Sequence, residues 1–204
     1  MANIQNVNYE ALPGQAKQMR ETGKNLNAEL KKAYESIGSM HSSWYGKRYN
    51  ELVTEFNKII PQINQILELV VGEVPFTLET VANNYSQADR GTKVTQAVKE
   101  APSKISELPT PNDVGMKFVT ENVSSVQKSV SENFNRAKEH MNSIEAQYKK
   151  IEWKSEASEA FKSAFDRLKT TIVSSFDNIN ASFTKLMNQT LQDIQSTENA
   201  NTVK

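Results

Sequence analysis

The stretch Met40-His41-Ser42-Ser43-Trp44-Tyr45-Gly46 lies between two segments that both carry the apolar spacing of an α-helix. Steps of three and four residues place apolar or small side chains along one face of a helix. Before the stretch these residues are Leu12, Ala16, Met19, Gly23, Leu26, Leu30, Ala33, Ile37 and Met40. After it they are Leu52, Phe56, Ile59, Ile63, Ile66 and Val70. The stretch is therefore predicted to be the turn of a helical hairpin, where Trp44 covers the open end and Gly46 lets the two helices approach closely.

Prolines and glycines predict the course of the second helix. Pro61 should kink it, because proline lacks an N–H and crowds the preceding turn. Gly72 and Pro75 should either kink the helix more strongly or break it. Helical spacing resumes beyond them and is predicted to continue to about Val98.

A proline-rich segment separates this hairpin from the rest of the chain. Three prolines disfavour helix in residues 101–113, which we predict to be a linker. Two more helical apolar faces follow. The first consists of Val119, Val123, Val126, Val130, Phe134, Ala137, Met141, Ile144, Tyr148 and Ile151, and the second of Phe161, Phe165, Leu168, Ile172, Phe176, Ile179, Phe183, Leu186 and Ile194. The polar tail after Gln195 is predicted to fray.

The second pair of helices repeats the plan of the first. Trp153-Lys154-Ser155 stands at its turn, as Trp44 does in the first pair. Aligning the two tryptophans pairs Leu52 with Phe161, Phe56 with Phe165, Ile59 with Leu168 and Ile63 with Ile172, which indicates an internal duplication. Each apolar face is narrow, so a lone hairpin would expose it to water. We therefore predict an all-α protein in which two long helical hairpins, residues 1–100 and a degenerate unit at 114–204, form a four-helix bundle.

Composition excludes several classes of function. Lys and Arg together number 24, as do Asp and Glu, so the net charge is zero and no basic face for nucleic acid is expected. Without cysteine there can be no disulfide, no thiol catalysis and no cysteine-ligated metal. Met1 to Leu12 lacks the features of a signal peptide. The most apolar run, Ile66 to Val71, is too short to span a bilayer, so no stable membrane insertion is expected.

No constellation of residues suggests catalysis. His41 and His140 lie in different predicted helices, without a carboxylate cluster at ligand spacing. Glu156 and Glu159 fit the first turn of a solvated helix, where they favour the N-terminal dipole. Phosphate-binding loops and nucleophile elbows are also missing from the sequence. We therefore predict no catalytic residues, no metal, no cofactor and no enzymatic activity.

Trp44 and Gly46, two residues apart at the turn of a helical hairpin, resemble the Trp-Xaa-Gly motif of the WXG family of type VII secretion substrates. Trp153 and Ser155 resemble a degraded copy of that motif. A second family feature, Tyr-Xaa-Xaa-Xaa-Asp/Glu near the end of the second helix, is matched by Tyr85 and Asp89. The spacing of four places ring and carboxylate on one helical face. In the second unit the tyrosine is lost.

The resemblance implies a non-enzymatic type VII substrate, cytoplasmic before export and then secreted, without a cleaved signal, from a Gram-positive-like bacterium. It implies two kinds of partner: the membrane ATPase of the secretion system, and a second hairpin, met either by self-association or in a WXG-family partner. The alternatives are a helical adaptor, or a chaperone or targeting partner for a type VII-secreted toxin.

Three structural expectations follow. Trp44 and Trp153 should both be substantially buried. Tyr85 and Asp89 should be exposed together and, because the family reads its two motifs from paired hairpins, should act with Trp153. Family hairpins pair antiparallel, so an intrachain pair needs the 101–113 linker to reach from one end of the bundle to the other, about 45 Å at ~3.4 Å per residue. The alternatives are a single-chain bundle with a taut linker and pairing between two chains.

Overall fold

The computed structural model describes residues 7–201 and is predominantly helical, with almost no strand, which confirms the all-α prediction. Its helices are α1 (Leu12–Met40), α2 (Lys47–Lys58), α3 (Ile60–Leu67), the π-helical segment η1 (Glu68–Glu73), α4 (Val74–Arg90), α5 (Thr120–Lys149) and α6 (Glu156–Asn201). Two short strands, β1 (Trp44–Tyr45) and β2 (Lys117–Phe118), pair antiparallel.

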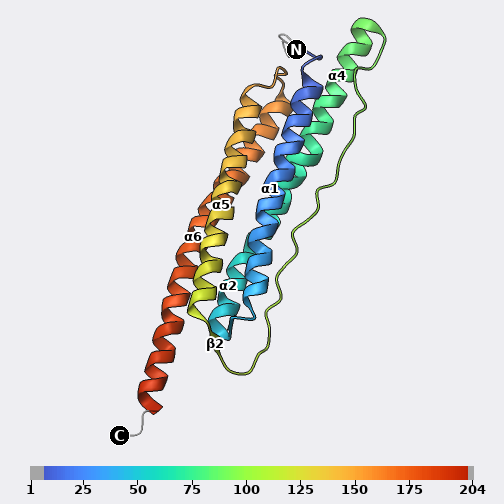
Figure 1. Ribbon diagram of the computed structural model, residues 1–204. Coiled ribbons are helices and arrows are strands. Elements are labelled where there is room, and N and C mark those ends of the chain that lie inside the picture. Colours follow the sequence, from blue (N-terminus) through green and yellow to red (C-terminus); the bar gives the residue numbers. More distant parts are fainter. Residues whose placement is uncertain (1–6, 202–204) are drawn as a thin grey trace.

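The helices form two long hairpins that lie side by side (Figure 1). In the first hairpin α1 runs against the series α2, α3, η1 and α4, and in the second α5 runs against α6. Between the hairpins, α1 packs on α5, and α6 packs on α2 and α3. The predicted apolar faces meet in one buried core, because each is a single stripe that only the partner hairpin can cover. Stacked rings of Phe56, Phe134 and Phe176 cross from one hairpin to the other.

The second helix of the first hairpin bends but does not break. α2 gives way to α3 at Ile59, shortly before Pro61, as predicted. At Gly72 and Pro75 the chain continues through the wider π-helical turn η1 directly into α4. Pro75 has no N–H to offer the Val71 carbonyl, and Arg20 Nε of α1 donates to that carbonyl at 3.4 Å. The π-helical turn thus replaces the break that was one of the two alternatives.

Arg20 also forms a buried ion pair inside the first hairpin. Its guanidinium holds the carboxylate of Glu79 through two bonds of 2.9 and 3.2 Å. It also donates to the Val98 carbonyl at 2.9 Å, and Glu79 accepts the Val98 N–H at 2.9 Å. The two side chains are only 10% and 7% exposed. This polar cluster therefore ties together α1, α4 and the chain that follows α4.

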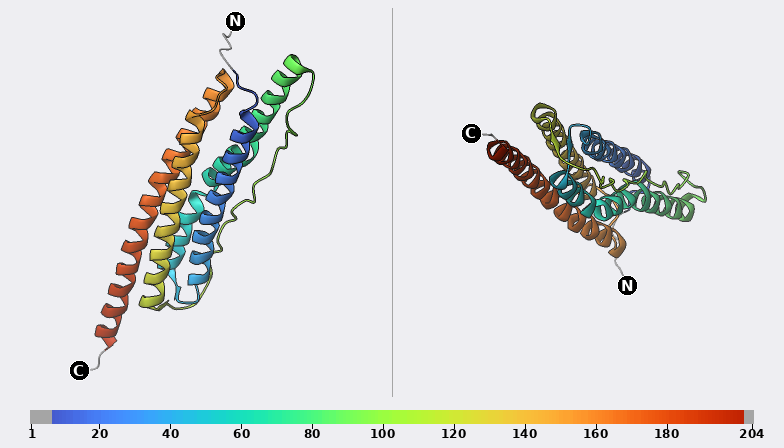
Figure 2. Two further views of the ribbon diagram at one scale, coloured as in Figure 1. Left: turned by 45° about the horizontal axis from the view of Figure 1, so that its top comes forward. Right: turned by 90° about the horizontal axis from the view of Figure 1, so that it is seen from below.

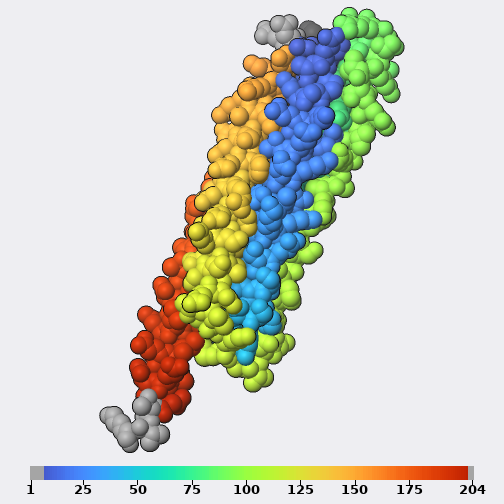
Figure 3. Space-filling view, viewed as in Figure 1, coloured from blue at the N-terminus to red at the C-terminus, as the bar shows by residue number. Residues whose placement is uncertain are grey.

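The connection between the hairpins is longer than predicted. α4 ends at Arg90 rather than near Val98, because Gly91 adopts a left-handed conformation (φ 72°) that closes the helix. α5 does not begin until Thr120. The extended chain between them runs along the first hairpin from one end of the bundle to the other (Figures 1 and 3). It need not be taut, since many more residues than 101–113 share the distance, and the two hairpins pack together within one chain.

The last helix continues further than predicted. α6 remains helical to Asn201, so fraying after Gln195 is wrong within the described residues. Figure 2 shows its C-terminal part projecting beyond the other helices. Most side chains after Thr190 are exposed, because no other helix reaches that far. Among residues 7–201, no helix has both the length and the apolar character needed to cross a membrane.

Glu145 on α5 should stabilise the second hairpin in a pH-dependent way. Hydrogen bonds from Lys169 of α6 and Lys149 of α5 lower the pKa of Glu145 from an ordinary 4.5 to about 2. A carboxylate with a depressed pKa in the folded state stabilises above the unfolded value, and the contribution disappears as pH falls from about 4.5 to 2.

We expect Glu145→Gln to lower the free energy of unfolding at pH 7 by no more than about 1 kcal/mol, because the pair is partly exposed. Chemical denaturation of both proteins at pH 7, 4 and 2.5 measures this difference. A gap between wild type and variant that stays constant down to pH 2.5 would contradict the assignment.

Candidate recognition surfaces at the two ends of the bundle

Trp44 forms the centre of one end of the bundle. It is buried, as predicted, and only 1% exposed. Its ring stacks on Phe183 of α6 at 6.0 Å between centroids and meets the edges of Phe118 and Tyr49 at 5.4 and 6.2 Å. Burial and the nearby carboxylate of Asp113 raise the pKa of Tyr49 to about 12, so this phenol stays neutral. Trp44 therefore joins its own hairpin to the second one.

Gly46 does not have the predicted role in helix approach. Its φ is 114°, a conformation that favours glycine, and a Cβ there would lie 3.3 Å from the carbonyl oxygen of Gly115. Gly46 thus lets the turn pass close to the chain that precedes β2. The close approach of helices instead occurs at Gly23 of α1, where a Cβ would lie 2.8 Å from Cγ2 of both Val70 and Val71.

The turn of the second hairpin is more open than that of the first. Trp153 packs against the core and is partly buried, so it is less completely covered than Trp44. Ser155, in the place of the glycine, begins α6: its Oγ accepts the Ser158 N–H at 3.2 Å, and its own N–H donates to Ser158 Oγ at 2.9 Å. This reciprocal pair caps the helix.

Tyr85 and Asp89 lie near the end of α4, and they are not equally exposed. Tyr85 is partly buried, whereas the side chain of Asp89 is 59% exposed. The Asp89 carboxylate accepts a hydrogen bond from the Tyr9 hydroxyl, which raises the pKa of Tyr9. Arg90 lies 3.5 Å from Asp89 and 2.6 Å from Glu10, with its guanidinium 5.5 Å from the Tyr9 ring centroid. The prediction that both residues are exposed therefore holds for Asp89 and only in part for Tyr85.

Sequence spacing could not reveal these partners of Asp89. Tyr9 is 80 residues away along the chain, and only the packing of α1 on α4 brings the two together. No local motif marks Tyr9 or Arg90.

The end of α4 and the α5–α6 turn lie at the same end of the bundle, opposite Trp44 (Figures 1 and 2). The start of α1 lies between them and contacts both sides. Gln15 donates to the Lys150 carbonyl at 2.9 Å and accepts the Glu152 N–H at 3.4 Å. On the other side, Tyr9 bonds Asp89. The elements that carry Tyr85, Asp89 and Trp153 are thus joined through one short segment of the chain.

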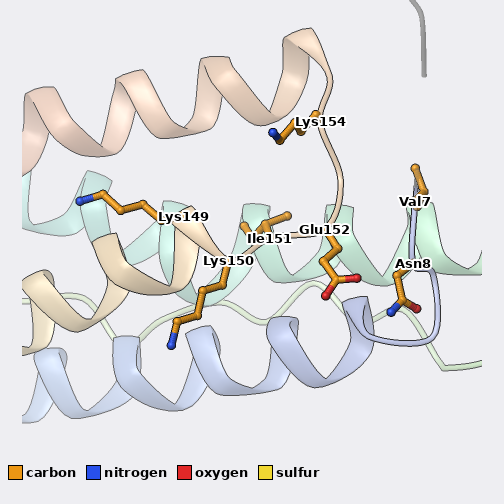
Figure 4. Close-up of a pocket in the computed structure, with 7 residues that line it drawn as sticks. All are labelled: Val7, Asn8, Lys149, Lys150, Ile151, Glu152 and Lys154. Atoms are coloured by element: carbon orange, nitrogen blue, oxygen red, sulfur yellow. The ribbon is translucent and has the colours of Figure 1, made fainter. Parts of the chain in front are cut away.

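A shallow pocket of about 640 Å³ hollows this end, between the segment before α1 and the α5–α6 turn (Figure 4). Its lining is mixed in charge and consists of Val7, Asn8, Lys149, Lys150, Ile151, Glu152 and Lys154. Trp153 lines an adjoining hollow of about 240 Å³ together with Tyr148 and Ser158. The indole of Trp153 is therefore accessible from solvent on one side.

The histidines and carboxylates of the described residues do not gather into a metal site. Within residues 7–201, no group of three or more His, Cys, Asp or Glu residues could hold a metal ion. His41 Nε2 lies 2.6 Å from Asp113 Oδ2, in a pair that joins the first turn to the linker.

Comparison with known proteins identifies the first hairpin. Residues 5–90 match the family model described as WXG100, proteins of 100 residues with WXG. The first hairpin belongs to the WXG100 family. The match ends at Arg90, the residue at which α4 ends. No curated protein and no solved structure matches the chain.

The WXG100 match covers the residues that carried the resemblance, including Trp44, Gly46, Tyr85 and Asp89. The family is associated with type VII secretion, and its members typically self-associate or pair with a second WXG protein. The second hairpin lies outside the match. Its relation to a WXG100 unit rests on the repeat of apolar residues around Trp153.

Proposed function

We propose that this chain is a non-enzymatic substrate of a type VII secretion system that carries both members of a hairpin pair in one polypeptide. The observation that supports it most is the meeting of α4's end and the α5–α6 turn at one end of the bundle. In the family, the Trp-Xaa-Gly turn of one hairpin and the Tyr-Xaa-Xaa-Xaa-Asp/Glu motif of its partner hairpin are recognised together. Here the antiparallel packing of the second hairpin brings the Trp153 turn to the end that carries Tyr85 and Asp89.

The proposed recognition surface consists of Tyr85, Asp89 and Trp153. It offers a receptor a partly exposed phenol, a carboxylate and an accessible indole, and aromatic anchors beside a charge are common in small binding hot spots. Trp44, in contrast, is covered by α6 and serves the fold. The partner in this proposal is the membrane ATPase of the secretion system, reached from the cytoplasm of a Gram-positive-like bacterium before export without a cleaved signal.

Removing the Asp89 charge should stop export while the fold is retained. We expect Asp89→Asn, and more strongly Tyr85→Ala with Asp89→Ala, to reduce the fraction of protein in the culture medium by at least about tenfold, as loss of a hot-spot residue does for binding. The melting temperature of Asp89→Asn should change little, because surface ion pairs contribute little to stability. Immunoblots of cells and medium, beside circular dichroism of the purified variants, measure both effects.

Glu10→Gln provides the matched control for Asp89→Asn. Glu10 is also 59% exposed, also contacts Arg90 and lies at the same end of the bundle. The Glu10→Gln variant should be exported as efficiently as the wild-type protein. Equal export of both variants would overturn the proposed signal, and failure of wild-type protein to leave the cells would favour a helical adaptor that stays inside.

A further inference from the structure

Three asparagines on the second helix of the WXG100 hairpin hold the linker. Asn50, Asn57 and Asn64 are seven residues apart, which places them on one helical face, and we call them the asparagine ladder. Each donates a hydrogen bond from Nδ2 to a linker carbonyl. The accepting carbonyls belong to Pro111, Leu108 and Ile105, at 2.9, 2.8 and 3.0 Å.

Two members of the ladder bind the linker backbone twice. The Oδ1 of Asn57 accepts the N–H of Leu108, and the Oδ1 of Asn64 accepts the N–H of Ile105, both at 2.9 Å. Each side-chain amide therefore pairs with both the N–H and the C=O of one residue, as a neighbouring strand would. Such pairing recognises an extended backbone rather than particular side chains.

The spacings of helix and linker match. Seven helical residues rise ~10.5 Å at 1.5 Å each, and three extended residues span ~10 Å. The helix and the linker run in opposite directions, so each step of seven along the ladder meets a step of three back along the linker. Ile105 is buried and Leu108 partly buried against the core, which adds apolar contact to the same register.

Asn50, the third member of the asparagine ladder, makes only one of the two possible hydrogen bonds. Asn50 Oδ1 is buried and has no hydrogen-bond partner. Its linker residue is Pro111, which has no N–H to donate. The unpaired acceptor is consistent with the register of the other two pairs. A non-proline residue at position 111 would supply the N–H that completes the pair of hydrogen bonds seen at Asn57 and Asn64.

We propose that the asparagine ladder is a recognition site for extended peptide backbone, with the chain's own linker as its ligand, and that docking protects the linker from proteases. The linker is the single covalent connection between the two hairpins. Lys104 is exposed but lies next to Ile105, whose backbone is bound by Asn64. A protease must take several residues of free, extended chain into its active site, so cleavage after Lys104 requires the ladder bonds to open first.

Limited trypsin digestion of the full chain tests this proposal. We expect the Asn57→Ala, Asn64→Ala double variant to be cut after Lys104 at least ~30-fold faster than wild type, because four backbone hydrogen bonds are lost. Asn84→Ala, at an exposed position on α4, is the matched control and should be cut at the wild-type rate. Mass spectrometry identifies the cleaved bond. Equal rates for the double variant and wild type would overturn the proposal.

Two further variants keep the test decisive if the double variant unfolds. Asn57→Asp has nearly the same shape and can still accept from Leu108 N–H, but as a carboxylate it cannot donate to the Leu108 carbonyl, so cleavage after Lys104 should still accelerate. Pro111→Ala supplies the missing N–H for Asn50 Oδ1. The new amide at 111 should exchange with solvent at least ~10-fold more slowly than those at 110 and 112. Exchange as fast as at those neighbours would overturn the register.

Discussion

Trp44→Ala is expected to lower the free energy of unfolding by about 3–5 kcal/mol, the range found when large aromatic side chains are removed from a core. Trp44 is 1% exposed and contacts Phe118, Tyr49 and Phe183. Phe183 belongs to the second hairpin, so the cavity would open at the junction of both hairpins and could not close by local collapse alone. Urea denaturation followed by circular dichroism measures the change.

Trp153→Ala is the control for this loss. Trp153 is only partly buried, so the same truncation should cost less than half as much. Equal losses at the two positions would show that the turns are equivalent in solution, contrary to the structure. An unchanged midpoint for Trp44→Ala would mean that Trp44 does not join the hairpins.

Glu79→Leu is expected to lower the free energy of unfolding by about 3 kcal/mol, because it leaves the buried guanidinium of Arg20 without its main counter-charge. The variant also loses the acceptor of the Val98 N–H. Glu100, 3.3 Å from Arg20 Nε, remains and compensates for part of the loss. Thermal and urea denaturation of the purified variant measure this effect.

A double-mutant cycle separates the ion pair from the size of the side chains. Arg20→Met combined with Glu79→Leu removes both charges and keeps apolar volume at the site. The double variant should be more stable than Glu79→Leu alone, because no buried charge is left uncompensated. Strict additivity of the two single losses would contradict the coupling of Arg20 and Glu79.

The helices and the first turn could be predicted from sequence because their information is local. Steps of three and four residues define an apolar face whatever the rest of the chain does, and almost every predicted core residue from Leu12 to Leu186 is buried or partly buried. Trp44, between two such faces, could only lie at the hairpin end. The existence of a proline-rich linker was equally a local property.

The asparagine ladder was missed, although a signal was present. Asn50, Asn57 and Asn64 repeat at seven, and Ile105, Leu108 and Pro111 repeat at three. Each repeat alone is common. Only the fold places the two side by side, and there the equal rise of seven helical and three extended residues becomes meaningful.

Only the tertiary structure decided the features that depend on contacts between residues distant in sequence. Helical spacing after Arg90 predicted more helix, but the chain beyond Gly91 gains more from bonds to Asn83 and Glu79 than from a helix without a partner. The packing of α1 on α4 brings Tyr9 to Asp89, whereas Trp153 remains only partly buried. A periodic pattern states which face of a helix must be covered. It does not state what covers it, since that depends on contacts made after the helices have packed.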